Sequence, residues 1–330
     1  MKYKIEEIKD GKVWNEFVKK EKHLNILSSW EWIEFERKIG FENEAYRIGD
    51  KGVFSFRVVN AKKGKYLILK QNVFLDWEDE DFVFSFISFL KLKCKEKGCK
   101  FFRIFPPILN TVEYEKLFEN YGFKKAVVHH TDAQVTVVLD LKKKEDEILK
   151  NMRKNTRYLV RKGEKLGVEV LHTDGNDYFD DFKKIYEETV RRHKWDASDL
   201  DYIKKQYELF SSHGLSRMFI AKYEGKVLAA SIFTKFQNQV IYHHSGSIPT
   251  EIPVMYSLIW EAIKYYKNKG LGEFNFFGVC EKDDIKHPWY GLSLFKRGFG
   301  GDARRLMHSY DYPVSRSYYL IRGIESVFNS

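Results

Sequence analysis

Apolar side chains recur with helical spacing and with strand alternation in turn along the N-terminal part of the chain. Trp32, Phe35 and Ile39 lie at positions i, i+3 and i+7, and Gly40 follows them. This spacing predicts a helix with one apolar face that ends at the glycine. Further runs predict strands at residues 45–48, 52–59, 65–69, 99–105 and 134–139, and helices at residues 79–97 and 113–121.

A similar succession begins at Leu141, where a very basic helical region extends to Leu166. Beyond it the patterns predict strands at residues 168–172, 218–223, 227–236, 239–245 and 273–277, and helices at residues 178–192, 200–211 and 256–267. The two halves therefore look like variants of one α/β (α+β) unit. No stretch is rich enough in Pro, Gly and Ser to be a flexible linker, so we expect a packed joint near Leu141.

Length, charge and cysteine content narrow the class of protein. A chain of 330 residues with 43% hydrophobic residues is long enough for two globular domains. The net charge of +10 favours a polyanionic partner such as nucleic acid or an anionic membrane surface. Three cysteines without zinc or CxxC spacing fit a reducing cytoplasm. No apolar run is long enough to span a bilayer, so we expect any membrane contact to be peripheral.

A row of cations follows the predicted domain joint. The row consists of Lys150, Lys154, Arg157, Arg161 and Lys165, at spacings of 4, 3, 4 and 4, which predicts one stripe along a single helix. Like charges at this spacing cost helix stability unless an anionic partner neutralises them, and phosphates would do so. The planar guanidinium of arginine also binds phosphate through two hydrogen bonds, a geometry to which lysine is less suited. The alternative is a solvated basic face in a lysine-rich protein.

A glycine-punctuated segment near the C-terminus, YGLSLFKRGFGG at residues 290–301, carries Lys296 and Arg297 beside Phe295. We interpret it as a loop whose glycines take positive φ and approach a ligand closely. Lys296 would supply a mobile positive charge for an oxyanion or a phosphate. Glycines beside lysines also form ordinary surface turns, and that alternative stays open here.

Other motifs for catalysis or metal binding are weak. His243 and His244 are adjacent on a predicted strand, where neighbouring side chains point to opposite faces, so we expect them not to share a metal ion. No acidic residue at a fixed spacing supports a Ser-His-Asp triad. Neither GxxxxGK[ST] nor GxGxxG occurs in the sequence. The sequence therefore predicts no metal site and no nucleotide-binding loop of these two types.

Five stretches, taken in order, resemble the Fem aminoacyltransferases (FemA, FemB, FemX, MurM), which add the bridge amino acids of bacterial peptidoglycan. They are WEWIEFERKIG, the segment from LDL to NMRKNTRYLVRKGEKLGVEV, YEETVRR, SGSIPTEIPVMYSLIWEAIKYYKNKGLGEFNFFGV and GLSLFKRGFGGDARRLMHSYDYPV. The second and fifth stretches are highly specific, and together the five cover nearly the whole chain. The coiled-coil arm of FemA and FemB is missing, which makes the layout similar to the compact FemX type.

The resemblance implies two acetyltransferase-like (GNAT) domains packed around a cleft. The first would comprise residues 1–143 and 305–330 on the side of the muropeptide precursor, and the second residues 144–304 on the side of aminoacyl-tRNA. The implied reaction moves Gly, Ala or Ser from aminoacyl-tRNA to the side-chain amine of the stem peptide of a UDP-linked or lipid-linked precursor. It needs no cofactor and no metal, and aminoacyl-tRNA serves as a co-substrate. The implied setting is the cytoplasm, including the inner face of the membrane.

The resemblance also implies roles for individual residues. Lys296 would stabilise the oxyanion beside Phe295 at the tRNA end, and Arg192 would bind the precursor's phosphates. Tyr242 is the best match to a substrate-contacting tyrosine. Tyr256 is a second candidate, but it lies on an apolar helix, which favours a role in packing.

The sequence departs from the family pattern at one position. Where the family places a lysine that grips phosphates together with the arginine, this chain has Glu36, with Lys38 two residues on. Lys38 and Arg297 therefore complete the substrate-binding candidates, and Lys150, Lys154, Arg157, Arg161 and Lys165 are the candidates for contact with tRNA.

Two other functions fit the same sequence. An acyl-CoA-dependent N-acyltransferase would need a [RQ]xxGx[GA] pyrophosphate loop, which residues 161–166 (RKGEKL) do not supply. A non-catalytic tRNA-binding protein would keep the fold without the reaction. The sequence alone leaves the transferred amino acid, the acceptor diamine, the bridge position, any general base and the oligomeric state undetermined.

Overall fold

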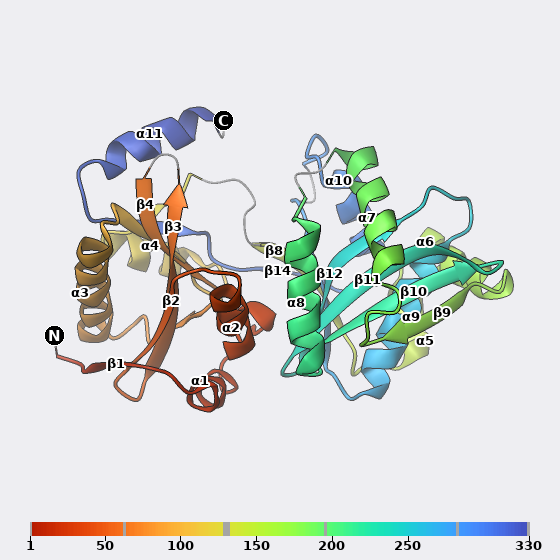
Figure 1. Cartoon of the computed structure of the whole chain (residues 1–330), viewed down its shortest axis with the longest axis horizontal. Helices are drawn as coiled ribbons and strands as arrows, with labels where there is room; N and C mark the ends of the chain where they lie inside the picture. The colour runs from red at the N-terminus through yellow and green to blue at the C-terminus, as the bar shows by residue number, and fades with distance from the viewer. Residues whose placement is uncertain (1, 62–63, 128–132, 195–196, 282–283, 329–330) are drawn as a thin grey trace. The chain divides into compact units, whose positions relative to one another are not determined.

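The computed structural model describes residues 2–61, 64–127, 133–194, 197–281 and 284–328, and it divides into two compact units. The first unit comprises Met1–Gln134 and Arg305–Ser330, and the second comprises Val135–Arg304. Figure 1 shows the C-terminal segment returning to the strands of the first unit. The resemblance to the Fem family implies a domain boundary between residues 143 and 144. The structural boundary falls nine residues earlier, because β8 (Val135–Asp140) pairs with a strand of the second unit.

The described part of the first unit is built on an eight-stranded sheet with the order β1-β2-β3-β4-β6-β15-β7 and β5 paired to β3. Its strands are β1 (Ile5–Glu7), β2 (Asn43–Ile48), β3 (Gly52–Ala61), β4 (Gly64–Lys70), β5 (Val73–Phe74), β6 (Phe101–Phe105), β7 (Lys124–Lys125) and β15 (Tyr310–Pro313). Its helices are α1 (Gly11–Val18), α2 (Trp30–Lys38), α3 (Glu80–Lys97), α4 (Val112–Asn120) and α11 (Tyr318–Phe328), with a 3-10 turn at Ile26–Ser28.

Crossover helices explain the parallel strand pairs of both sheets. In the first unit β4 runs parallel to β6, and α3 is the connection that such a pair requires. Phe82 and Phe86 of α3 pack in the same core cluster as Phe54 and Phe102 of the sheet.

Side chains cap the N-termini of two of these helices. The Ser29 side chain accepts a hydrogen bond from Trp32 N at the start of α2, and the Asp79 side chain accepts one from Phe82 N at the start of α3.

The second unit carries a seven-stranded sheet with the order β14-β8-β13-β12-β11-β10-β9 among the described residues. Its further strands are β9 (Glu169–Thr173), β10 (Ser216–Tyr223), β11 (Lys226–Phe236), β12 (Gln239–Ser247), β13 (Glu273–Gly278) and β14 (Asp302–Arg305). Its helices are α5 (Glu145–Asn151), α6 (Lys154–Lys165), α7 (Phe179–His193), α8 (Leu200–Ser212), α9 (Val254–Asn268) and α10 (Tyr290–Gly298). The helix α9 connects the parallel pair β12 and β13.

Two expectations about local structure are wrong, and one helix of the structure was not expected. Residues 290–298 form the helix α10 rather than a loop, and only Gly300 and Gly301 of this segment take positive φ. The predicted basic helix is two helices, because Met152 takes extended backbone between α5 and α6. The sequence patterns did not predict α11 at all.

No helix among the described residues is both long enough and apolar enough to cross a bilayer.

Candidate functional site

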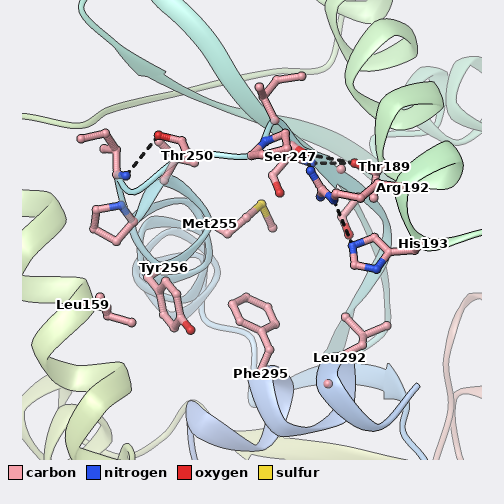
Figure 2. Close-up of a pocket in the computed structure, with 18 of the residues that line it drawn as sticks. Leu159, Thr189, Arg192, His193, Ser247, Thr250, Met255, Tyr256, Leu292 and Phe295 are labelled. Carbon is pink, nitrogen blue, oxygen red and sulfur yellow. Dashed lines mark hydrogen bonds between the residues drawn. The ribbon is translucent and has the colours of Figure 1, made fainter. Parts of the chain in front are cut away.

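A cavity of about 690 Å³ opens in the second unit, where the ends of four elements meet. Its wall is formed by the end of α7, the end of β12, the turn that follows, the start of α9 and one face of α10. In Figure 2, Tyr256 and Phe295 face the cavity, while Arg192 and His193 reach it from α7. Arg192, Tyr242, Tyr256 and Phe295 are thus brought together by the fold.

Aromatic rings make one wall of this cavity. Tyr256, at the start of α9, meets Phe295 of α10 edge to face, with ring centroids 5.2 Å apart. Phe299 stacks under Tyr256 at 5.8 Å and is fully buried. Tyr256 remains partly exposed, so it both packs and lines the cavity. A flat apolar group can therefore rest on this wall.

Hydrogen bonds fasten the end of β12 to α7 on the opposite wall. Thr189 Oγ1 accepts from Ser247 N at 3.0 Å, and Arg192 donates to Ser247 O at 3.1 Å. A Cβ at Gly246 would lie 2.9 Å from Ile185 O, so only glycine allows this approach. The exposed guanidinium of Arg192 is thereby held at the cavity, where it can bind an anion.

Tyr242 and Ser245 add hydroxyl groups to the same wall. Tyr242 Oη donates to Ser245 Oγ at 2.6 Å. Burial raises the pKa of Tyr242 to about 12, so the phenol stays protonated at neutral pH. The pair offers neutral hydroxyls rather than a base.

Lys296 lies behind this wall. It is 6% exposed, its Nζ donates to Gly278 O at 2.7 Å, and it sits 5.8 Å from the centre of the Tyr242 ring. Burial lowers the pKa of Lys296 from 10.5 to about 7. The prediction that Lys296 supplies a mobile charge from a loop is therefore wrong, because its ammonium is buried and the residue lies in the helix α10. Its neighbour Arg297 donates to Cys280 O at 2.6 Å.

The two adjacent histidines of β12 differ from the expectation that they point to opposite faces. A β-bulge pairs Ile232 with His244 and Phe233 with Tyr242, which leaves His243 as the extra residue. The rings of His243 and His244 stack with centroids 4.1 Å apart. Burial lowers the pKa of both imidazoles, that of His243 to about 4. Among the described residues no group of three metal-binding side chains forms around them.

The first unit holds the remaining substrate-binding candidate, Lys38, exposed in the last turn of α2. Glu36, two residues earlier, is buried and pairs with Arg57 at 3.1 Å, while Asn43 donates to it at 2.6 Å. Burial raises the pKa of Glu36 above its ordinary value. Glu36 therefore stabilises the packing of α2 on the sheet and is not placed as a phosphate ligand.

The cationic row is divided between two helices. Lys150 lies in the last turn of α5, whereas Lys154, Arg161 and Lys165 are exposed along α6. Arg157 is the exception, because its guanidinium donates to Leu149 O and Lys150 O at the end of α5. This residue joins the two helices and caps α5, a structural role that the spacing could not reveal.

Sequence reasoning missed several residues of the cavity. They include Thr189 as an anchor of the wall, and the apolar side chains of Leu159, Met255 and Leu292. The one signal was the pair Pro249 and Pro253, which bounds the turn between β12 and α9. The apolar residues carried no signal, since they share their spacing with ordinary core positions.

Comparison with known proteins identifies the family of this chain. The model of the FemAB family matches residues 116–223 and 214–326, more than half of the chain. The chain therefore belongs to the FemAB family, and the family resemblance of its sequence is confirmed.

Two characterised relatives are distant in sequence. The chain is 25% identical to a UDP-N-acetylmuramoylpentapeptide-lysine N(6)-alanyltransferase of Weissella viridescens, over 62% of each chain. It is 21% identical to a lipid II:glycine glycyltransferase of Staphylococcus epidermidis, over 94% of this chain and 93% of that enzyme. The first match thus spans less than two thirds of that relative's length.

Solved structures share the fold at lower identity. A crystal structure of FemX superposes with a TM-score of 0.84 and 15% identity, covering 98% of this chain and 100% of that one. A tandem GNAT protein from the clavulanic acid pathway superposes with a TM-score of 0.60 and 7% identity, covering 95% and 99%. The prediction of an α/β chain with acetyltransferase-like units is confirmed.

Proposed function

We propose that this chain transfers an amino acid from aminoacyl-tRNA to the side-chain amine of a stem peptide in a peptidoglycan precursor, forming a peptide bridge. Membership of the FemAB family and the names of its two relatives, an alanyltransferase and a glycyltransferase, support this reaction. The donor amino acid is glycine, alanine or serine. The precursor is either UDP-linked or lipid-linked.

The observation that carries the proposal is the composition of the cavity wall. One side presents the exposed cation Arg192, and the other presents the rings of Tyr256 and Phe295. A phosphate fits the first side and a base or an apolar side chain fits the second. Lys296 lies behind the wall formed by Tyr242, one residue along α10 from Phe295.

The reaction requires little covalent catalysis by the protein. The neutral amine attacks the ester carbonyl, a C–N bond forms, and the C–O bond to the terminal ribose of the tRNA breaks. The proton lost by the amine ends on the leaving hydroxyl. Because the ester is already activated, positioning and stabilisation of the oxyanion supply most of the acceleration. In this proposal Lys296 provides the positive charge, and its buried site makes that charge stronger than it would be in water.

The exposed cations Lys154, Arg161 and Lys165 of α6 would bind the phosphates of the tRNA, together with Lys150. Arg192 would bind the phosphates of the precursor, and Lys38 of the first unit remains a candidate for the same role. Arg297 holds Cys280 O and would act by fixing the end of α10.

The test is a transfer assay with purified full-length protein. Bulk tRNA is charged with labelled glycine, alanine or serine and offered with the UDP-linked or the lipid-linked pentapeptide. We expect label on the precursor for at least one pairing.

Acetyl-CoA with the same acceptors is the matched control. Transfer from acetyl-CoA but from no charged tRNA would replace the proposal by acyl-CoA chemistry. Tight tRNA binding without any product would leave a binding protein instead.

A further inference from the structure

The C-terminal helix α11 exposes apolar side chains and turns its charges inward. Tyr319, Leu320 and Ile324 are 58%, 73% and 42% exposed. Leu320 and Ile324 are four residues apart, so they lie on one face of the helix. Between Tyr319 and Ser326 the outward face also carries Gly323 and Ser326, and no charge.

The charged residues of α11 are bound to the first unit. Glu325 accepts from Arg103 at 3.1 Å, while Arg322 donates to Lys125 O at 2.6 Å and to the Tyr318 hydroxyl at 3.2 Å. Tyr318 and Ile321 are buried beneath the helix. A helix on a protein surface normally shows the reverse pattern, with charges turned to water. These bonds hold α11 on the first unit while its apolar face points outward.

Exposed cations lie beside this helix. Arg316 precedes it. Lys124 on β7 is paired with Asp311, whose carboxylate accepts from the Tyr318 hydroxyl of α11, so Lys124 lies on the face of the sheet that α11 covers. An apolar helix face with an arginine and a lysine beside it complements the boundary between acyl chains and anionic headgroups.

We infer that α11 docks in the headgroup region of an anionic lipid bilayer and holds the protein on that surface. Tyr319, Leu320 and Ile324 enter the acyl boundary, and Arg316 and Lys124 contact lipid phosphates. The inference stands apart from the proposed reaction, since it needs neither tRNA nor precursor. Its failure would leave the transfer assay unaffected, and the failure of that assay would leave the lipid contact unaffected.

The experiment measures binding of the full chain to sedimented vesicles of phosphatidylcholine, with and without phosphatidylglycerol. We expect binding to the anionic vesicles that weakens as salt is added. Leu320→Glu should weaken binding about tenfold or more, because it puts a charge of the same sign as the lipid where an apolar group would enter the acyl boundary. Leu92→Glu is the matched control, because Leu92 is 48% exposed on α3 of the same unit, and it should bind like the wild type.

A variant that is expected to bind vesicles more tightly distinguishes a lipid contact from loss of binding through misfolding. A Cβ at Gly323 would meet no atom within 4 Å, so Gly323→Leu adds apolar area to the outward face without a clash. It should strengthen vesicle binding about tenfold, an effect that a purely structural role of α11 would not produce.

Absence of binding to the anionic vesicles, or equal binding by all three variants, would overturn the inference. A wild-type dimer in light scattering that Leu320→Glu dissociates, with no vesicle binding, would show instead that a second copy covers this face.

Discussion

The buried position of Lys296 opposes the cationic role that we propose for it. Its ammonium donates to Gly278 O and lies near the ring of Tyr242. Such a group costs stability when charged and gains electrostatic strength for the same reason. Both consequences can be measured on one substitution, with Lys267 as a matched control, because Lys267 Nζ also donates to a backbone carbonyl, that of Leu141.

The first prediction concerns the pH dependence of turnover. The acceptor amine must be neutral, so the rate should rise with pH, while loss of the Lys296 proton above its pKa of about 7 should flatten that rise. Lys296→Met should lower the single-turnover rate by roughly 10²–10³-fold, the effect of losing one oxyanion donor. The rate of this variant should keep rising above pH 7. A Lys296→Met enzyme with wild-type rates would exclude the assigned role, and Lys267→Met should leave the profile unchanged.

The second prediction concerns stability. Between pH 7 and pH 10.5 the unfolded chain carries a proton on Lys296 that the folded protein does not, so its contribution to the free energy of unfolding rises with pH. Lys296→Met removes this unfavourable contribution, worth on the order of a few kcal/mol below pH 7. The variant's advantage over wild type should therefore shrink from pH 7 toward pH 10 in urea unfolding. A difference that does not change with pH would contradict the buried, neutralised lysine.

At the scale of elements, the break between α5 and α6 separates cations that the spacing had joined. Arg157 is bonded to the end of α5, so the members of the row that a polyanion can contact are Lys150 on α5 and the exposed Lys154, Arg161 and Lys165 on α6.

The third prediction tests this division by measuring tRNA affinity against salt. Arg161→Gln should weaken binding and reduce the slope of log affinity against log salt by about one. Lys226→Gln, at an exposed position on β11, serves as the control with the same charge change. Equal slopes for both variants would assign tRNA binding to the net charge of the protein rather than to α6.

The turn after α10 depends on close backbone approach. Gly301 has φ +90°, and a Cβ there would lie 2.6 Å from Val138 O of β8. Gly225 has φ +74° with no atom within 4 Å of such a Cβ.

The fourth prediction compares these two glycines. Gly225→Ala should cost about 1 kcal/mol for the backbone conformation, whereas Gly301→Ala should cost on the order of 3 kcal/mol or more because the backbone must also move. Chemical denaturation of the two variants checks the difference. Similar losses would mean that β14 shifts freely.

On the scale of the whole molecule, the first unit is completed by a segment that follows the second unit in sequence. β15 lies between β6 and β7, and Asp311 on β15 forms a buried ion pair with Arg103 on β6, with Arg103 Nε to Asp311 Oδ1 at 2.6 Å.

The fifth prediction follows from this pair. Asp311→Asn leaves the Arg103 charge without its bidentate partner and should destabilise the first unit by about 3–5 kcal/mol. The second unit should keep its own unfolding transition, which calorimetry can separate. Equal shifts of both transitions would mean that the two units unfold as one cooperative body.

The periodicity of apolar residues determined most helices and strands, because burial of one face is a local pattern that a strand or helix repeats. The resemblance of sequence motifs to the Fem family marked Arg192, Tyr242, Tyr256 and Phe295, which the fold brings to one cavity. Only the tertiary structure decided the rest. The bulge that turns His243 toward His244, the burial of Lys296 and the inward charges of α11 all depend on partners far away in the sequence. Long-range packing sets solvent exposure and local field, and neither quantity is encoded in the spacing of neighbouring residues.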